Sequence, residues 1–372
     1  MSRYRLELAT EADDEDLRRV LADTPMDGRI QVAFHREPSY FGGASVDGRF
    51  HQTIACRDTE SGRIIGFGSR SITERYINGV PEPIGYLSAL RVLEQHRNRG
   101  LVARGYAYFR KLHTADNRTT LYLTTIAEGN EAALAVLTSG RAGLPAYHEA
   151  GWFYTVAIPI RRRQQARPLH FQGTIRPAAA SDAVVILDFL TQHGPARQFF
   201  PCYTAADIFS AHGLLRSLRP ENVLLAYVGD RLTGILGGWD QQTFRQSVVH
   251  GYSGSLRYSR TLYNAWAWAR GLPPLPSVGK PFRYLMGALP IVADHCAVVF
   301  HALLDELLRR AAGMAYQYLL VGLHESDPLL RELQSYGGAE YKTRLFLVCW
   351  EDGEPLRKSL DGRPPYLELG CL

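Results

Sequence analysis

The segment from Ile84 to Leu112 constrains the fold of this chain more than any other stretch of the sequence. Residues 84–92 (IGYLSALRV) form an apolar, β-prone run that predicts a buried strand. Residues 94–99 are polar, and Gly100 leads directly into a helical pattern. One face of that helix is expected to carry Leu101, Gly105, Tyr108 and Leu112.

The turn between this strand and this helix offers a place for an anion. The first N–H groups of a helix have no internal partner, and the helix dipole places about half a positive charge there. Arg97 and Arg99 add full charges, and Gly100 lets a phosphate approach the backbone. A solvated helix cap is the alternative interpretation, because basic turns before helices are common.

This strand, turn and helix resemble the coenzyme A loop of the GNAT acyltransferase superfamily, which carries R/Q-x-x-G-x-G/A about five residues after a strand valine. After Val92, Arg97 and Gly100 match the pattern, while Val102 stands where the family prefers glycine or alanine. The resemblance implies that the chain binds acetyl-CoA or another acyl-CoA. The residues that it implies for this loop are Leu90, Arg91, Val92, Arg97, Asn98, Arg99, Gly100, Leu101, Val102 and Ala103.

Two further residues match the family. Residues 147–152 (YHEAGW) fit its Y-x-x-x-G-F/W motif. The resemblance implies that Tyr147, on the last helix, gives a proton to the departing thiolate; a half-buried tyrosine that packs this helix onto the sheet is the alternative. Asn130 stands where the family has an asparagine that touches the cofactor arm, and it is also a good helix N-cap. These two roles are compatible.

The sequence does not identify a general base. No carboxylate lies within the strand at 84–92. A proton could be relayed by any of several nearby groups, each of which is also an ordinary surface residue: Glu82, Glu94, Glu128, His35, Glu37 and His148.

The order of elements in the first 160 residues is that of the GNAT fold, an α/β fold with a mixed sheet. The patterns predict β-α-β-β-β-α-β-α-β, with 35–47 as a loop. Tight turns are expected at Ser61-Gly62 and Asn78-Gly79. The strands are expected at 4–9, 52–56, 64–72, 84–92, 119–126 and 151–160, and the helices at 14–21, from 101, and at 130–137.

The rest of the chain repeats this pattern. Asp13, Arg63 and Asn130 have counterparts at Asp182, Arg231 and Asp327. The offset widens along the chain, which indicates an insertion of about 29 residues in the second copy, best placed at 255–282 as an aromatic-rich helix and a proline-rich loop. The chain therefore resembles a tandem GNAT protein. Its expected parts are a catalytic domain (1–160), a linker (161–173), a degenerate domain (174–352) and a C-terminal tail (353–372).

The second copy lacks the residues that the family uses. Its counterpart of the cofactor loop, residues 291–297 (IVADHCA), contains neither arginine nor glycine. Asp294 would place a negative charge where a pyrophosphate binds, although it could simply cap the next helix. Gln334 stands at the position of Tyr147. We therefore expect the active site in the first half.

Composition narrows the partners and the compartment. The net charge is only +5, carried almost wholly by arginine, and no nucleic-acid signature occurs. Five scattered cysteines include no C-x-x-C pair, so no metal or disulfide framework is expected. Without a signal-like or membrane-length apolar run, the expected location is the cytoplasm.

Two functions from different classes fit these patterns. The first is an N-acyltransferase that acetylates a small-molecule or peptide amine by direct attack on acetyl-CoA. The alternative is a catalytically silent acyl-CoA-binding or interaction protein, which Val102 and the missing base favour.

Overall fold

The computed structural model describes residues 3–141, 143–161 and 171–372. Most of the expected linker, residues 162–170, lies outside the described residues. Among the residues that are described, no helix combines the length and the apolar character needed to cross a bilayer.

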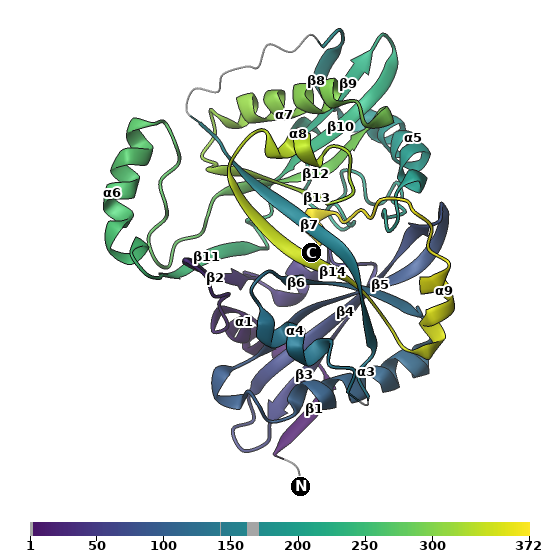
Figure 1. Ribbon diagram of the computed structural model, residues 1–372, viewed down its shortest axis with the longest axis vertical. Helices are drawn as coiled ribbons and strands as arrows, with labels where there is room; N and C mark the ends of the chain where they lie inside the picture. The colour runs from purple at the N-terminus through teal and green to yellow at the C-terminus, as the bar shows by residue number, and fades with distance from the viewer. Residues whose placement is uncertain (1–2, 142, 162–170) are drawn as a thin grey trace.

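The core of the molecule is a twelve-stranded mixed sheet, so the expected α/β fold class is confirmed (Figure 1). Its strands lie in the order β1-β3-β4-β5-β6-β14-β7-β13-β12-β10-β9-β8. The bounds are β1 (Tyr4–Leu8), β3 (Phe50–Asp58), β4 (Ile64–Ile77), β5 (Val80–Val92), β6 (Leu121–Ala127), β7 (Ala146–Pro159), β8 (Thr174–Pro177), β9 (Val223–Val228), β10 (Arg231–Trp239), β12 (Tyr284–Val292), β13 (Tyr318–His324) and β14 (Ala339–Cys349). A separate ribbon pairs β2 (Ile30–His35) with β11 (Gln246–Tyr252).

From either edge of the sheet to its centre, equivalent strands of the two halves follow one another in the same order. Each half has one parallel pair, β5 with β6 and β12 with β13. The helices follow the same scheme, since α1, α3 and α4 in the first half have counterparts α5, α7 and α8 in the second. This arrangement supports two copies of one unit. The helix bounds are α1 (Asp14–Ala22), α2 (Tyr40–Ala44), α3 (Leu101–Asp116), α4 (Glu131–Leu137), α5 (Ala183–His193), α6 (Leu256–Ala269), α7 (Ala297–Ala311), α8 (Leu330–Gln334) and α9 (Glu354–Lys358).

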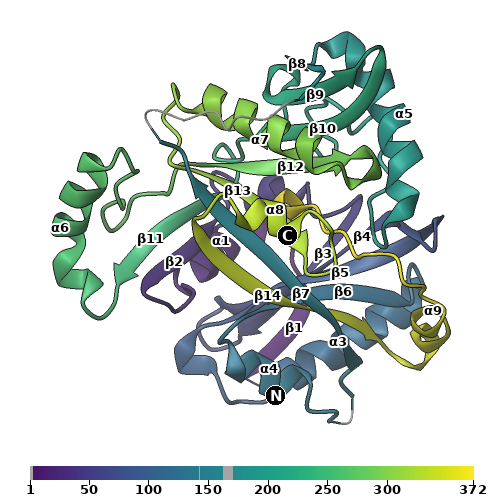
Figure 2. The same cartoon turned by 45° about the horizontal axis from the view of Figure 1, so that its top comes forward.

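The two central strands cross over between the halves (Figure 2). In the last strand of the first half, β7, residues Phe153–Pro159 pair with the whole of β13 of the second half, and β14 of the second half pairs with β6 of the first. Each half therefore completes the sheet of the other. A cut in the expected linker would divide the sequence without dividing this hydrogen-bonded sheet.

Several local predictions are confirmed. Gly62 takes a positive φ of 72° in the turn between β3 and β4, and Asn78 and Gly79 do so between β4 and β5. Helix α3 begins at Leu101, and the side chain of Asn130 caps α4 by accepting from the backbone N–H of Ala133 at 3.2 Å. The inserted helix of the second half is α6, which projects from the body of the molecule in Figure 1.

Two local predictions are wrong. The region expected as a loop contains α2, because the side chain of Ser39 caps the helix N-terminus. Tyr147 lies on β7 and not on a helix, because Gly140 and Gly143 take positive φ and Pro145 follows, which ends the helical path after Leu137. The strand therefore starts at Ala146, and Gly151 forms a bulge within it.

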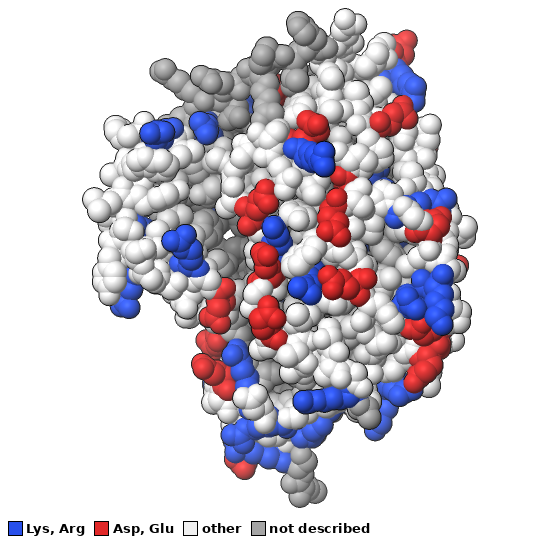
Figure 3. Space-filling model, viewed as in Figure 1, with Lys and Arg blue, Asp and Glu red and all other residues white. Residues whose placement is uncertain are grey.

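Residues 353–372 pack against the body of the protein. Tyr366, Leu367 and Cys371 are buried, and the segment ends beside β12. On the face shown in Figure 3, basic and acidic side chains are interspersed.

Candidate active site

The sheet opens where the parallel strands β5 and β6 separate. They pair only at Gly85 with Tyr122 and at Tyr86 with Leu123, although both strands run on to Val92 and Ala127. A Cβ on Gly85 would lie 2.0 Å from the ring of Tyr122, so only glycine lets the two strands meet here. Beyond this point the diverging strands leave room for a ligand between them.

A β-bulge shapes the wall of this opening. Ala89 and Leu90 stand opposite the single residue Gly68 on β4, and Ala89 takes a positive φ of 54°. A bulge leaves a residue out of the regular pairing and re-aims its backbone groups. Positive φ at a non-glycine residue stores strain, which is typical of functional sites.

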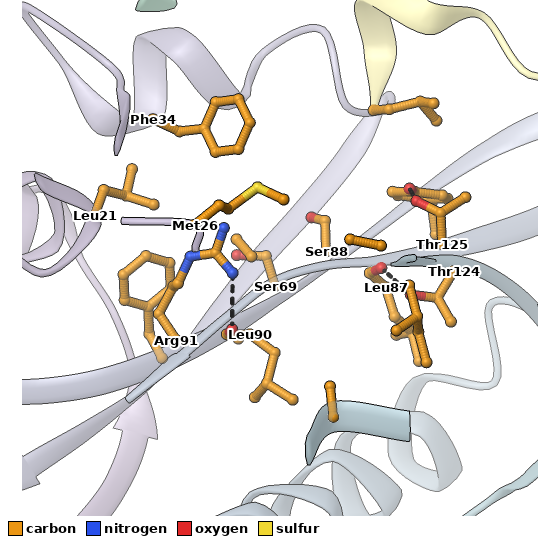
Figure 4. A pocket seen from close by; sticks show the side chains of 18 of the residues that line it. Leu21, Met26, Phe34, Ser69, Leu87, Ser88, Leu90, Arg91, Thr124 and Thr125 are labelled. Carbon is orange, nitrogen blue, oxygen red and sulfur yellow. Dashed lines mark hydrogen bonds between the residues drawn. The ribbon is translucent and has the colours of Figure 1, made fainter. Parts of the chain in front are cut away.

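A cavity of about 490 Å³ passes through the opening. On one side of β5, Leu87 and Leu90 point toward the helices, whereas Ser88 and Arg91 point toward Met26 and Phe34 on the other (Figure 4). The helix side is lined by Leu101, Val102, Gly105, Tyr106, Asn130 and Tyr147. The opposite side is lined by Phe34, His35, Arg36, Arg245, Ser247, Tyr284, Tyr341 and Leu372.

The structure brings seven of the twelve expected site residues into the cavity wall. These are Leu90, Arg91, Val92, Leu101, Val102, Asn130 and Tyr147. The other five do not line the cavity: Arg97, Asn98, Arg99 and Gly100 form the exposed turn between Val92 and Leu101, and Ala103 faces solvent on α3. Gly100 has a φ of 67°, which glycine adopts without strain, and it begins the helix as expected.

The hydroxyl of Tyr147 meets that of Tyr106 on α3 in a hydrogen bond beside the cavity. Burial raises the pKa of Tyr147 far above its ordinary value, and burial raises the pKa of Tyr106 to about 12. Both hydroxyls therefore stay protonated at neutral pH. Tyr147 can donate to a negative charge that develops in the cavity.

The sequence patterns did not reveal the residues on the opposite side. Arg36 follows β2 of the first half, whereas Arg245 precedes β11 of the second, and both bond the buried carboxylate of Asp47. Nothing in the local sequence indicates this contact, because it joins residues 198 positions apart. Because Asp47 is buried and bonds both arginines, its carboxylate is the shared partner of the two guanidinium groups.

The structure separates the general-base candidates by whether they line the cavity. His35 lines the cavity, and burial lowers its pKa, so the ring is neutral at pH 7 and can accept a proton. Among the described residues, no aspartate or glutamate lines the cavity, which leaves out Glu37, Glu82, Glu94 and Glu128. His148 instead bonds Glu354 at 2.8 Å.

One group in the described part of the chain has the composition of a metal site. His148, Cys349 and Glu354 place one ligand atom each within 4.8 Å of one another. Glu354 is already bonded to His148 and to Arg357, and the group lies outside the cavity wall. We assign it no metal.

The second half has the same bulge in a form that is closed. Leu289 and Pro290 stand opposite Leu236, and Leu289 has a φ of 52°. Pro290, the counterpart of Leu90, has no backbone N–H. The N–H of Leu289 donates to the carboxylate of Glu368 at 3.1 Å. The tail of the chain thus fills the position that stays open in the first half.

Helix α7 also leaves little room for a ligand. A Cβ on Gly234 of β10 would lie 2.8 Å from the side chain of Val299 and 2.9 Å from that of Leu303. The helix therefore packs directly on the strand, and these contacts support the expectation that the second half is inactive.

Glu368 should make the stability of the protein depend on pH. Burial raises the pKa of its carboxyl to about 7, although Tyr366 donates to it at 2.6 Å. Between about 4.3, the ordinary value of glutamate, and this raised value, the folded protein binds the extra proton. Stability should therefore fall as pH rises through this window, by up to about 1.4 kcal/mol per pH unit.

Urea unfolding of the wild type and of Glu368→Gln across pH 4–8 measures this effect. The variant should show a shallower fall, because its amide does not titrate. Parallel profiles for the two proteins would contradict the raised pKa.

Comparisons with known proteins identify the fold. No protein-family model matches the sequence, and no curated protein matches it. Among solved structures, a GCN5-related N-acetyltransferase from Sphaerobacter thermophilus matches with a TM-score of 0.54 and 12% identity, over 100% of this chain and 99% of that one. Saccharomyces cerevisiae N-myristoyltransferase with bound myristoyl-CoA matches with a TM-score of 0.59 and 10% identity, over 94% and 83% of the two chains.

A conserved protein of unknown function from Enterococcus faecalis V583, described as a probable N-acyltransferase, matches with a TM-score of 0.51 and 10% identity. The match covers 94% of this chain and 73% of the Enterococcus faecalis chain. The chain therefore has the fold of the GCN5-related N-acetyltransferases, as the sequence predicts. At these identities the likeness concerns the fold alone.

Proposed function

We propose that this protein is an acyl-CoA-dependent N-acyltransferase, most simply one that uses acetyl-CoA, with its coenzyme site and its general acid in residues 1–160 and with residues of the second half on the acceptor side of the cavity. The observation that carries the proposal is the cavity between the diverging strands β5 and β6. It combines the bulge at Ala89 and Leu90 with the buried hydroxyl of Tyr147. The fold shared with N-acyltransferases supports the same conclusion.

The reaction needs positioning and proton control from the protein. A neutral amine of the acceptor attacks the thioester carbonyl, an N–C bond forms, and the C–S bond breaks. The backbone N–H groups at the bulge would stabilise the oxygen as it becomes negative. The amine nitrogen loses one proton to His35 or water, and the departing thiolate gains one from Tyr147, which takes a proton back from solvent.

The coenzyme would lie against α3 with its pyrophosphate at the helix N-terminus. The unpaired N–H groups there and the charges of Arg97 and Arg99 suit a phosphate, and the space around Gly100 is open. Asn130 would reach the pantetheine arm from α4, since it lines the same cavity. The N-myristoyltransferase match shows that this fold accepts a long acyl chain in another protein.

Coenzyme binding should depend on the turn before α3. Arg97→Ala should weaken the binding of coenzyme A by about 10- to 100-fold, because a charge-assisted hydrogen bond contributes about 1.5–3 kcal/mol. Gly100→Asp should abolish binding, because it adds a negative charge and a side chain at a positive-φ position. Isothermal titration calorimetry measures both.

The matched control is Asp294→Arg, at the corresponding turn of the second half. It should leave affinity unchanged. If Asp294→Arg altered coenzyme binding while Gly100→Asp did not, the coenzyme site would lie in the second half, and the proposal would be wrong. Release of free thiol from acetyl-, octanoyl- and myristoyl-CoA, with a panel of amines, amino acids and peptides, tests the activity itself. Tight binding without turnover for any acceptor would favour the silent acyl-CoA-binding protein.

A further inference from the structure

The cavity is unusually positive for a buried space. Four arginines line it (Arg36, Arg70, Arg91 and Arg245), and no acidic side chain among the described residues does. Arg70 pairs with Asp116, and Arg36 and Arg245 share the single carboxylate of Asp47. Arg91 has no ion pair within the described part of the chain. Arg245 also donates to the oxygen of the last residue, Leu372, at 3.0 Å, and Leu372 lines the cavity too. Among the described residues, Arg91 is therefore the one of the four guanidinium groups that has no anionic partner.

Two of these guanidinium groups present buried donors that the protein leaves unbonded. Nη1 of Arg36 and Nε of Arg91 are buried without a hydrogen-bond partner. Arg36 is only 8% exposed. An unmet buried donor costs about 1–3 kcal/mol, and more when it is charged. Arg75 and Arg197, which do not line the cavity, also have an unbonded Nε. Arg36 and Arg91 differ from them because they line the cavity, where a bound acceptor of hydrogen bonds could meet their guanidinium groups.

The position of Arg91 shows which ligand these donors face. It lies just after the bulge, on the side of β5 that points toward Met26 and Phe34, whereas Leu90 points toward the helices (Figure 4). Burial, and then the positive charges of Arg97 and Arg36, lower the pKa of Arg91. Arg91 and Arg36 are therefore close enough to repel each other. The coenzyme would occupy the helix side, which leaves this side for the acceptor.

We propose that the acceptor amine also carries a carboxylate, and that Arg91 and Arg36 bind this carboxylate on the side of β5 away from α3. The planar guanidinium fork matches a carboxylate better than any other side chain does. Leu21, Met26 and Phe34 supply an apolar wall beside it. The acceptor class is therefore an amino acid with an apolar side chain. The role of this amino acid as the acceptor rests on the proposed function, but its binding to the cavity can be tested separately.

The test measures binding and needs no turnover. L-leucine, L-methionine and L-phenylalanine are titrated by calorimetry into the full chain, with and without coenzyme A, and each is compared with its own amide. The amide keeps the amine and the side chain but removes the negative charge. At least one amino acid should bind about 10-fold or more tightly than its amide, the gain expected from one charge-assisted bond.

Variants assign this preference to the cavity. Arg91→Gln should remove it, and Arg91→Lys, which keeps the charge without the fork, should retain part of it. Arg110→Gln is the matched control, because Arg110 is exposed on α3 and pairs with Glu351. Equal affinity for acids and amides, no binding of any amino acid, or an unchanged preference in Arg91→Gln would overturn the proposal. A failure of thiol release would instead count against the acyltransferase activity alone.

Discussion

Replacement of Tyr147 by phenylalanine is expected to lower kcat by about 100-fold or more, the low end of the range for a general acid. The hydroxyl lies in the cavity wall, is protonated because burial raises its pKa, and is held by Tyr106. A thiolate of pKa about 8.5 leaves more readily when a donor stabilises its charge. Phenylalanine keeps the ring and its packing but removes this donor.

Steady-state kinetics and coenzyme titration together distinguish catalysis from packing. For a catalytic role, kcat should fall while coenzyme affinity stays nearly constant. For a structural role, the variant should lose at most about 1 kcal/mol of stability and keep its turnover. Tyr316→Phe is the matched control, since its hydroxyl donates to Asp240 at 2.8 Å outside the cavity wall. Normal turnover in folded Tyr147→Phe would exclude Tyr147 as the acid.

Local sequence patterns correctly predict most of the elements in the first half of the fold. The strand at 84–92, the glycine and the helix from Leu101 lie as expected, because each depends on residues close in sequence. Asn130 was placed by the same local rule, as a helix cap. The prediction that Tyr147 lies on a helix is wrong because the glycines and the proline that precede it end the helix, although the motif spacing is matched.

The rest of the site could not be read from the sequence, because it forms between distant segments. The exchange of β7 and β14 depends on which edges of the two half-sheets meet, and no local period encodes that choice. Arg245 reaches the cavity only because β11 pairs with β2. Its partner Asp47 lay within a stretch that was expected to be a loop. The bulge at Leu289 corresponds to the bulge at Ala89 through its place in the sheet, and no shared sequence motif marks the two positions.

The contact of Asp47 with Arg36 and Arg245 predicts the largest effect on stability. Asp47 is 3% exposed, accepts from Nη2 of Arg36 at 2.9 Å, and also bonds Arg245. His51, whose pKa is lowered to about 4 by burial, adds no charge at pH 7. Asp47→Ala would leave two buried guanidinium groups facing each other without an anion. The free energy of unfolding in urea should therefore fall by about 3–5 kcal/mol at pH 7.

The pH dependence of this loss gives an independent check with Asp47→Asn. Burial acts to raise the pKa of Asp47, but the charges of Arg36 and Arg245 outweigh it and hold the pKa below its ordinary value. The carboxylate therefore stabilises the folded protein at pH values above about 3.9, the ordinary value, and this contribution is lost as pH falls through the lowered pKa. The difference between wild type and Asp47→Asn should be complete at pH 7 and should shrink in acid.

Asp23→Ala provides the control, because Asp23 is 54% exposed and lies 3.8 Å from Arg19 in a surface ion pair that should contribute less than about 1 kcal/mol. If Asp47→Ala were no more destabilising than this control, the three buried charges would not hold the two halves together. The positive cavity would then have to be stabilised in another way. Because Arg36 belongs both to this contact and to the proposed carboxylate site, Asp47→Asn should also bind the amino acid probe at least as tightly as the wild type. The same substitution would thus weaken the fold while it leaves the cavity more positive.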